Sequence, residues 1–365
     1  MPKPRNAPDV VIIASILALL TIGVIMVYSA SAAYSYDKFG DSFFYAKRQM
    51  LFAALGVFLM LLISRIDPEL FYRWAKPSLW ICFALLALVL VPGVGMVRGG
   101  ARSWLGIGAF SIQPSEFMKL AVILFLAQYL TSNARENQTL TKGIVIPLSI
   151  AGAAFALIMM QPDLGTGTVL MGTAFVLIFA AGARLKYLLG LCLLGVAGFA
   201  GLVLAAPYRI QRITAFLDPW QDPLGAGYQV IQSLFAIGPG GLMGLGLGMS
   251  RQKHLYLPEP HTDFIFSILA EELGFLGAGT AIILFAVLVW RGLRVAIRVP
   301  DMFMALIATG VTAMIIIQAV INIGVVTGSF PVTGITLPFL SYGGSSLTLT
   351  LMAVGLLLNL SRYTK

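Results

Sequence analysis

The chain has 365 residues, of which 59% are hydrophobic and 11% are charged, and its mean hydropathy is +0.91. A soluble domain carries about 25% charged residues, so this composition excludes a soluble globular protein and indicates an integral membrane protein. The net charge of +9 is typical of basic cytoplasmic loops beside anionic membrane lipids. We therefore expect contact with membrane lipids and no nucleic-acid partner.

Apolar runs near the spanning length of about 20 residues predict an all-α polytopic membrane protein with ten transmembrane helices in a single domain, 1–365. Ser29-Ala-Ser-Ala-Ala33 after the first run resembles a signal-peptidase site. That run is longer than a typical signal-peptide core, so we interpret it as a retained helix. The predicted spans are 10–30, 50–66, 77–97, 112–131, 143–161, 166–183, 187–206, 263–290, 302–327 and 344–361.

Lysine and arginine are distributed unevenly between the loops on the two sides of these spans. The side that holds both chain ends carries most of them, whereas the opposite short loops carry only Lys38, Lys47, Arg48, Arg98 and Arg102. The positive-inside rule therefore makes both termini cytoplasmic. The segments expected outside are 31–49, 98–111, 161–165, 207–262 and 328–343.

Two arginines in the outer segments, Arg48 and Arg102, each precede a predicted span. Either could be an unpartnered surface charge. Arginine is also well suited to bind phosphate, because it is always charged and offers forked donors. Both are therefore candidate substrate-binding residues.

The fourth span opens with Gln113-Pro-Ser-Glu-Phe-Met-Lys119. Pro114 suits the first helical position, which places Glu116 third, where it can close a cap. Lys119 follows three residues later on the same face, so a local ion pair is possible. Lys119 could extend to the membrane interface, or it could face a substrate anion in a water-filled cavity.

The outer connection Gln161-Pro-Asp-Leu-Gly-Thr166 contains one carboxylate, Asp163. Aspartate beside proline and glycine commonly forms an Asx turn, and this structural use is one interpretation. The other is that Asp163 belongs to the same outer site as Glu116 and Lys119.

Segment 207–262, between the seventh and eighth helices, is far longer than an ordinary loop, and such loops are usually functional or disordered. Its stretches 209–217 and 228–236 read as short amphipathic helices that lie on the membrane. Between 238 and 248 the segment is apolar and dense in glycine, and could act as a mobile gate.

Asp263 stands where this outer loop enters the eighth span. It could cap the helix by accepting bonds from free backbone N–H groups, or it could act as a catalytic base. Glu271 and Glu272 lie deeper in the same span, and ionisable groups at membrane depth are functional candidates by default. We interpret these two glutamates as structural hydrogen-bonding groups.

An outer cavity that holds carboxylates and cations suits a large anionic amphiphile, such as a lipid-linked pyrophosphate. A carboxylate could deprotonate an attacking sugar hydroxyl while cations stabilise the departing pyrophosphate. The residues alone predict this class of chemistry and no more.

The motifs resemble those of the shape, elongation, division and sporulation (SEDS) family, and within it the chain is most similar to the FtsW branch. The resemblance runs from the first span to the last. It rests on Gly100-Ala-Arg-Ser-Trp104, Phe110-Ser-Ile-Gln-Pro-Ser-Glu-Phe-Met-Lys119, Gln161-Pro-Asp-Leu-Gly-Thr166, Asp222-Pro-Leu-Gly-Ala-Gly-Tyr228, Pro258-Glu-Pro-His-Thr-Asp-Phe-Ile-Phe266 and Pro331-Val-Thr-Gly-Ile-Thr-Leu-Pro-Phe-Leu-Ser-Tyr-Gly-Gly-Ser-Ser346.

The resemblance implies a ten-helix peptidoglycan glycosyltransferase that polymerises lipid II at the outer face of the bacterial cytoplasmic membrane. It also implies a class B penicillin-binding protein as the partner that cross-links the strands. The family's essential aspartate falls on Asp263. Its other site residues fall on Arg102, Glu116, Lys119 and Asp163.

We therefore expect Asp263 to act as the general base, with Arg48, Arg102 and Lys119 holding the pyrophosphate. A divalent cation, Mg²⁺ or Mn²⁺, could assist them, although its ligands are unassigned, and no organic cofactor is expected. Two rival functions remain at this stage. One is a lipid II flippase, and the other is a noncatalytic scaffold that recruits the penicillin-binding protein.

Overall fold

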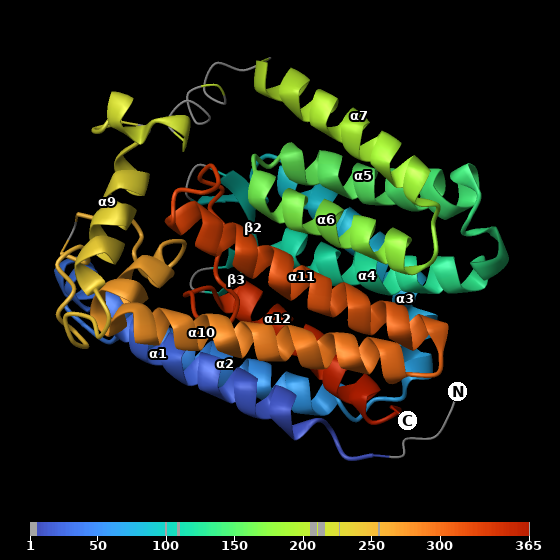
Figure 1. Ribbon diagram of the computed structural model, residues 1–365, viewed down its shortest axis with the longest axis horizontal. Helices are drawn as coiled ribbons and strands as arrows, with labels where there is room; N and C mark the ends of the chain where they lie inside the picture. Colours follow the sequence, from blue (N-terminus) through green and yellow to red (C-terminus); the bar gives the residue numbers. More distant parts are fainter. Residues whose placement is uncertain are drawn as a thin grey trace.

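A computed structural model describes residues 6–98, 101–107, 110–204, 210, 216–225, 227–254 and 256–364. Most of these residues are helical, and the long helices lie side by side as a bundle (Figure 1). The elements are α1 (Val10–Phe39), α2 (Phe44–Ile63), α3 (Pro68–Leu90), β1 (Met96–Arg98), β2 (Ala101–Ile107), β3 (Phe110–Ile112), α4 (Pro114–Ser132), η1 (Ala134–Glu136), η2 (Thr141–Val145), α5 (Ile146–Met159), α6 (Leu164–Ala180), α7 (Leu185–Leu204), η3 (Pro219–Gln221), α9 (Tyr228–Ile237), η4 (Gly238–Gly240), α10 (Ile265–Arg298), α11 (Met302–Val326) and α12 (Gly344–Ser361).

Among the described residues, seven helices are long and apolar enough to cross a membrane. Helix α6 has 17 residues and is a shorter apolar helix. Helices α4, α6 and α7 occupy the remaining predicted runs, and for these three the prediction of a span stays a prediction. The seven are α1, α2, α3, the continuous stretch Thr141–Met159, α10, α11 and α12.

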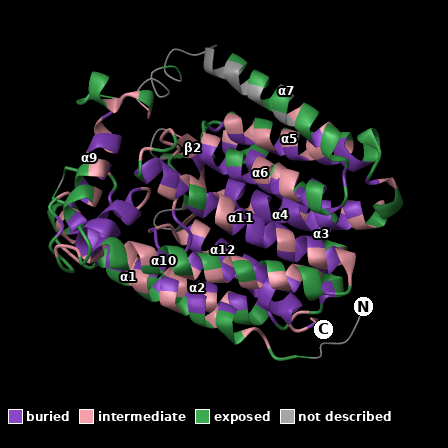
Figure 2. Cartoon of the chain, viewed as in Figure 1, coloured by how far each residue is buried: buried purple, intermediate pink, exposed green. Residues whose placement is uncertain are grey.

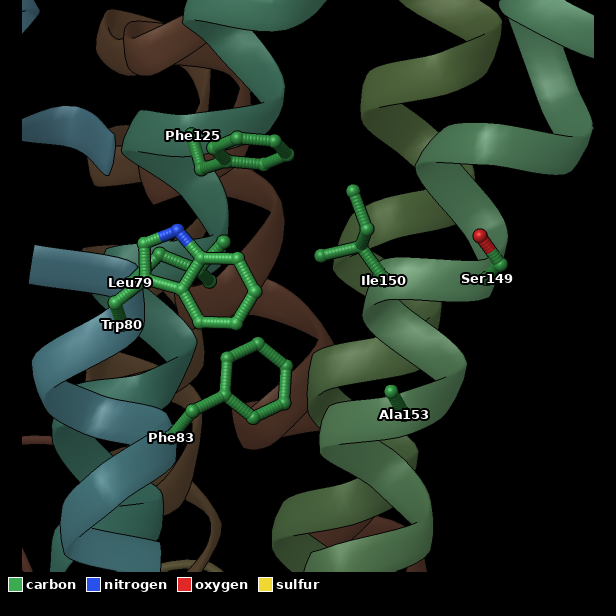
Figure 3. Close-up of a pocket in the computed structure, with 7 residues that line it drawn as sticks. All are labelled: Leu79, Trp80, Phe83, Phe125, Ser149, Ile150 and Ala153. Carbon is green, nitrogen blue, oxygen red and sulfur yellow. The ribbon is translucent and has the colours of Figure 1, made fainter. Parts of the chain in front are cut away.

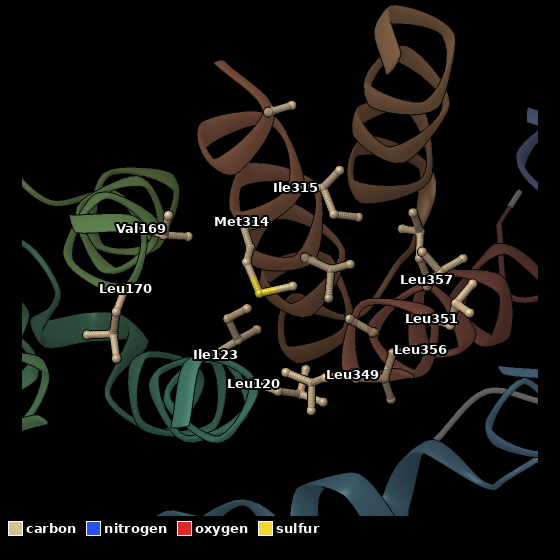
Figure 4. Close-up of a cluster of buried hydrophobic side chains, with 14 of the residues drawn as sticks. Leu120, Ile123, Val169, Leu170, Met314, Ile315, Leu349, Leu351, Leu356 and Leu357 are labelled. Atoms are coloured by element: carbon tan, nitrogen blue, oxygen red, sulfur yellow. The ribbon is translucent and has the colours of Figure 1, made fainter. Parts of the chain in front are cut away.

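Helices α11 and α12 form the inner part of the bundle together with α4. The most apolar stretches of α11 and α12 are 67% and 78% buried, whereas that of α2 is only 22% buried. Apolar side chains of α4, α6, α11 and α12 meet there, as Figure 4 shows, and buried residues concentrate on the same helices in Figure 2. Polar side chains on these inner helices therefore face protein.

A small antiparallel sheet corrects the prediction of an all-α protein. Strands β1, β2 and β3 pair in that order, with Arg98 opposite Ala101 and Ile107 opposite Phe110. The strands are too short to stand out in the sequence beside the long apolar runs on either side. The sequence therefore predicts only an outer loop over 98–111.

The two ends of the bundle differ. Both chain ends lie at one end, where the Asn6 side chain donates to the carbonyl of Thr364 at 2.7 Å. The sheet and α9 lie at the other end, together with the segment that precedes α10 (Figure 1). The side of the membrane on which each end lies stays a prediction.

The long segment before α10 is partly helical. Helix α9 confirms the amphipathic helix predicted over 228–236, whereas most of the one predicted over 209–217 lies outside the described residues. The glycine-dense stretch after α9 packs against α10, where Leu245 and Gly246 donate their N–H groups to the carbonyls of Glu271 and Glu272. It is therefore hydrogen-bonded to the start of α10.

Candidate active site

Asp263 precedes the first turn of α10 and does not cap it. The N-cap position is Phe264, which is buried and makes no side-chain cap. The Thr262 hydroxyl donates to the carbonyl of Glu259 at 2.9 Å instead of to the helix. The Asp263 carboxylate accepts no hydrogen bond from the part of the chain that the structure describes. The capping interpretation is therefore wrong, and the carboxylate is available for chemistry.

The backbone around Asp263 is fixed by three contacts from elsewhere in the chain. The Asn322 side-chain amide on α11 donates to the carbonyl of Asp263 at 2.7 Å. Ser341 donates its hydroxyl to the carbonyl of Thr262 at 2.6 Å, and the Tyr342 N–H donates to the carbonyl of His261 at 2.8 Å. A free carboxylate thus sits on a rigid peptide, as an active-site base requires.

Burial raises the pKa of Asp263 to about 6, and the negative charges of Glu259 and Asp163 act in the same direction. Desolvation and like charge both disfavour the ionised form of a carboxyl group. A general base works best when its pKa lies near the operating pH. The surroundings of Asp263 therefore suit a carboxyl group that takes up and releases a proton near the operating pH.

Asp163 is used differently, although it also stands at the start of a helix. Its Oδ1 caps α6 by accepting from the Thr166 N–H at 3.0 Å. Its Oδ2 accepts from the Gln113 side-chain amide at 2.9 Å and from the Ser115 hydroxyl at 3.4 Å. Burial raises the pKa of Asp163, and the bonds from Thr166 act against this rise. Asp163 therefore joins the start of α6 to the start of α4.

Lys119 is buried and does not extend to the membrane interface. Its ammonium lies 2.9 Å from Glu116 Oε1, which confirms the predicted local pair, and it also donates to Gln318 Oε1 at 2.9 Å. The Lys119 side chain is only 2% exposed. Glu116 Oε2 is buried and has no partner among the described atoms. A cation and a carboxylate are thus held together inside the bundle.

The irregular segment 331–337 brings these groups together. Gly334 has a φ of +72°, and a Cβ built on it would lie 3.6 Å from Asp263 Oδ2. A Cβ on Gly165 would lie 2.9 Å from the carbonyl oxygen of Thr333, so the start of α6 also contacts this segment closely. Asp263, Asp163 and the Lys119 pair therefore surround one stretch of backbone.

The two arginines lie at the same end of the bundle. Arg48, on α2, is half-buried and stacks over the Phe44 ring at 4.2 Å. Arg102, on β2, is also half-buried and stands opposite Val97 in the sheet. Neither arginine forms an ion pair with a described acidic residue. Both remain candidates for binding an anion, and no direct contact joins either arginine to Asp263.

Glu271 and Glu272 hold the segment that leads to Asp263. Glu272 accepts from Ser29 on α1 at 2.7 Å and forms an ion pair with Lys253 at 3.0 Å. Glu271 accepts from the N–H of Arg251 at 2.8 Å. Both glutamates are fully buried. The interpretation of these residues as structural agrees with their contacts.

Three residues that sequence reasoning missed take part in these contacts, namely Lys253, Gln318 and Asn322. Gln318 and Asn322 stand four residues apart in an apolar span, which puts them on one helix face. Amides in such a run are costly unless they are hydrogen-bonded. That cost is the signal that could have identified them.

The described residues contain no group of three or more His, Cys, Asp or Glu side chains that could hold a metal ion. Asp263 offers free oxygens, whereas both oxygens of Asp163 already accept hydrogen bonds. Mg²⁺ is commonly bound by one or two carboxylates together with substrate phosphates. The donor set therefore fits an ion that arrives with a phosphate-bearing substrate better than a resident metal.

A separate groove of about 240 Å³ lies between α3, α4 and α5 (Figure 3). Its lining is apolar apart from Ser149 and includes the aromatic rings of Trp80, Phe83 and Phe125. The groove contains no titratable side chain. It is therefore not a place for acid–base chemistry.

The family model that describes the FtsW, RodA and SpoVE cell cycle proteins matches residues 10–365. The chain belongs to this family. It is 60% identical to the stage V sporulation protein E of Bacillus subtilis (strain 168) over 365 residues, which are 100% of both chains. It is 43% identical to the probable peptidoglycan glycosyltransferase FtsW of Trichlorobacter lovleyi over 357 residues, covering 98% of this chain and 94% of that one.

Solved structures of this family have the same fold. A chain from a study of how a peptidoglycan synthase complex coordinates polymerization and crosslinking matches with a TM-score of 0.81 and 33% identity, covering 98% of this chain and 99% of that one. The rod shape determining protein RodA of Thermus thermophilus matches with a TM-score of 0.74 and 30% identity over the same shares. Membership of the family therefore rests on sequence and on fold.

Proposed function

We propose that this protein is a peptidoglycan glycosyltransferase that polymerises lipid II. The observation that carries the proposal is the Asp263 carboxylate, which has a fixed backbone, no hydrogen-bond donor among the described residues and a pKa raised to about 6. Relatives named peptidoglycan glycosyltransferases supply the reaction that such a base would serve.

In this proposal Asp263 takes the proton from the 4-hydroxyl of the incoming lipid II as that oxygen attacks C1 of the growing strand. The new C1–O bond forms while the bond from C1 to the pyrophosphate oxygen breaks, so undecaprenyl pyrophosphate leaves with the bonding electron pair. An α-linked donor gives a β-1,4 product, and this inversion suits a single direct displacement. General-base catalysis contributes about 10²–10⁴-fold to such a step.

Arg48, Arg102 and Lys119 would bind the pyrophosphate, because fixed cations stabilise charge that develops on a leaving group. Glu116 would orient Lys119, to which it lies at 2.9 Å. Asp163 would hold the start of α4 beside the substrate. A divalent cation, Mg²⁺ or Mn²⁺, would enter with the pyrophosphate and add positive charge there, and no organic cofactor is needed.

The proposed setting is the bacterial cytoplasmic membrane, with ten spans in one domain, both termini in the cytoplasm and the Asp263 end of the bundle outside. Lysine and arginine concentrate in the loops at the other end, as the positive-inside rule requires. A class B penicillin-binding protein is the proposed partner, because a structural relative belongs to a complex for polymerization and crosslinking. Membrane lipids complete the set of partners.

Asp263→Asn tests the proposal, because asparagine keeps the shape of the side chain and cannot act as a base. Full-length protein in liposomes, with lipid II and the partner transpeptidase, should form glycan polymer, and the variant should form none while still binding the partner. Polymer from the variant would remove Asp263 from the catalytic role. Movement of labelled lipid II across the bilayer without polymer would favour a flippase instead. Unchanged cell-wall synthesis in cells carrying the variant would favour a scaffold.

A further inference from the structure

We propose that Gln318 and Asn322 are positioning residues that set Lys119 and Asp263 relative to each other. The proposal rests on the function proposed above. The two amides stand one helical turn apart on α11, and together they form a ladder, here called the amide ladder, between the candidate cation and the candidate base.

The first rung is Gln318, which is 2% exposed. Its Oε1 accepts from the Lys119 ammonium at 2.9 Å, and its Nε2 donates to the carbonyl of Thr336 at 3.0 Å. Both ends of this amide are therefore used. Gln318 joins Lys119 on α4 to the irregular segment 331–337.

The second rung is Asn322, which is 1% exposed. Its Nδ2 donates to the carbonyl of Ile335 at 2.6 Å and to that of Asp263 at 2.7 Å. A side-chain amide carries two N–H donors, and both serve here. Asn322 joins the same irregular segment to the peptide of Asp263.

The ladder satisfies backbone groups that no secondary structure pairs. Residues 331–337 have no regular hydrogen-bonded structure, so the adjacent carbonyls of Ile335 and Thr336 need other donors. A buried carbonyl without a donor is costly. The two rungs supply donors to these neighbouring carbonyls, so one rigid helix fixes the segment that faces the Asp263 carboxylate.

Each rung has a distinct kinetic consequence. Loss of Asn322 removes the side-chain donor that holds the carbonyl of Asp263 and leaves only the contacts to His261 and Thr262. A displacement of about 1 Å at a reacting group can lower the rate about 100-fold. We expect Asn322→Leu to lower kcat by roughly that factor with little change in KM. Loss of Gln318 removes one of the two contacts that hold the Lys119 ammonium and leaves only the pair with Glu116. Because Lys119 is proposed to bind substrate, Gln318→Leu should mainly raise KM.

Asn359 on α12 provides a matched control. It is also fully buried, and its Nδ2 also donates to two carbonyls, those of Ile63 and Ile66. It lies at the opposite end of the bundle, near the chain termini. Asn359→Leu should lose thermal stability as Asn322→Leu does, and should keep the kcat and KM of the unmodified protein.

Two conservative variants complete the experiment, which measures polymerisation of lipid II by the full chain with its partner. Gln318→Glu keeps an acceptor for Lys119 and loses the donor to the carbonyl of Thr336, so it should reverse only part of the rise in KM that Gln318→Leu causes. Asn322→Asp keeps the side-chain volume and replaces the donors by acceptors, so it should lower kcat and carries the test if Asn322→Leu does not fold.

The failures of the two proposals can be told apart. Polymer from Asp263→Asn overturns the proposed function. If Asp263→Asn is inactive while the Gln318 and Asn322 variants have unchanged kinetics, only the amide ladder is wrong. Equal losses of kcat in Asn322→Leu and Asn359→Leu would also overturn it, because they would show a general packing effect.

Discussion

Asp163 and Asp263 are aspartates at the starts of apolar helices, yet their surroundings give them different uses. Asp163 accepts bonds from Thr166, Gln113 and Ser115, so its oxygens serve structure. The Asp263 carboxylate faces Gly334 and accepts no bond from any residue that the structure describes. The residue type was the same in both motifs, and only the neighbouring donors separate a helix cap from a candidate base.

A pH profile should report the pKa of Asp263. Its pKa of about 6 lies above the ordinary value of 3.8, chiefly through burial and then through Glu259 and Asp163. A base must be ionised, so we expect kcat/KM to fall as the pH drops through about 6. Glu259→Gln removes the charge with the larger repelling effect on Asp263 and should move this acidic limb to lower pH.

Glu69→Gln is the control for that profile. Glu69 lies in the first turn of α3, where it pairs with Arg73. Removing its charge should leave the acidic limb where it is. An acidic limb that is unmoved by Glu259→Gln would mean that another group controls the profile.

The same raised pKa predicts that Asp263 costs stability. The carboxyl group of Asp263 has a pKa of 3.8 in the unfolded chain and of about 6 in the folded protein. The contribution of Asp263 to stability is therefore intact below pH 3.8 and is lost as the pH rises to about 6. Asp263→Asn should therefore stabilise the protein at neutral pH, by about 1–3 kcal/mol.

Thermal unfolding of both forms at several pH values measures this gain. The gain should vanish below about pH 4, because both states of the unmodified protein are then protonated. A variant that is less stable at neutral pH would show that the carboxylate makes a structural contact.

At the scale of elements, α10 is interrupted at Gly274, where φ is 64° and ψ is −162°. This backbone region is essentially restricted to glycine. Beyond the break, the N–H groups of Phe275 and Leu276 donate to the carbonyls of Gly241 and Leu242. The glycine-dense stretch thus supplies acceptors that the interrupted helix lacks, which explains why a segment with no strong preference of its own has a defined path.

Gly274→Ala should destabilise the protein by about 1–3 kcal/mol, because the new Cβ adds backbone strain and would lie 2.3 Å from the N atom of Gly244. Gly279→Ala in the same helix is the control, since a Cβ there meets nothing within 4 Å. It should be neutral or stabilising by up to about 1 kcal/mol. Thermal unfolding would measure both, and equal effects of the two substitutions would contradict the importance of the break.

At the scale of the whole molecule, the bundle places the chain termini at one end and the candidate site at the other (Figure 1). The proposed orientation predicts that the Asp263 end faces outward. In a variant without Cys82 and Cys192, Lys38→Cys should react with a membrane-impermeant maleimide in intact cells. Arg298→Cys should react only after the membrane is opened. The reverse pattern would invert the proposed topology, and with it the access of Asp263 to substrate.

The apolar runs predicted where the helices lie, because a helix that crosses a membrane needs about 20 apolar residues in a row. The i,i+3 spacing likewise predicted the pair of Glu116 and Lys119, because helix geometry alone brings such residues together. The sequence motifs were enough to identify the family. Apolar runs and helical spacing therefore predicted the helices and the local pair, and they placed Asp263 where the outer loop enters the eighth span.

Contacts between elements could not be predicted in this way. Lys119 meets Gln318, and Asp263 meets Asn322, only because α4, α10 and α11 pack in one particular register. The short sheet and the hydrogen bonds between the glycine-dense stretch and α10 also depend on where distant segments pass. Hydrogen bonds across the bundle have no period in the sequence, so the tertiary structure alone decided which buried polar groups support the candidate base.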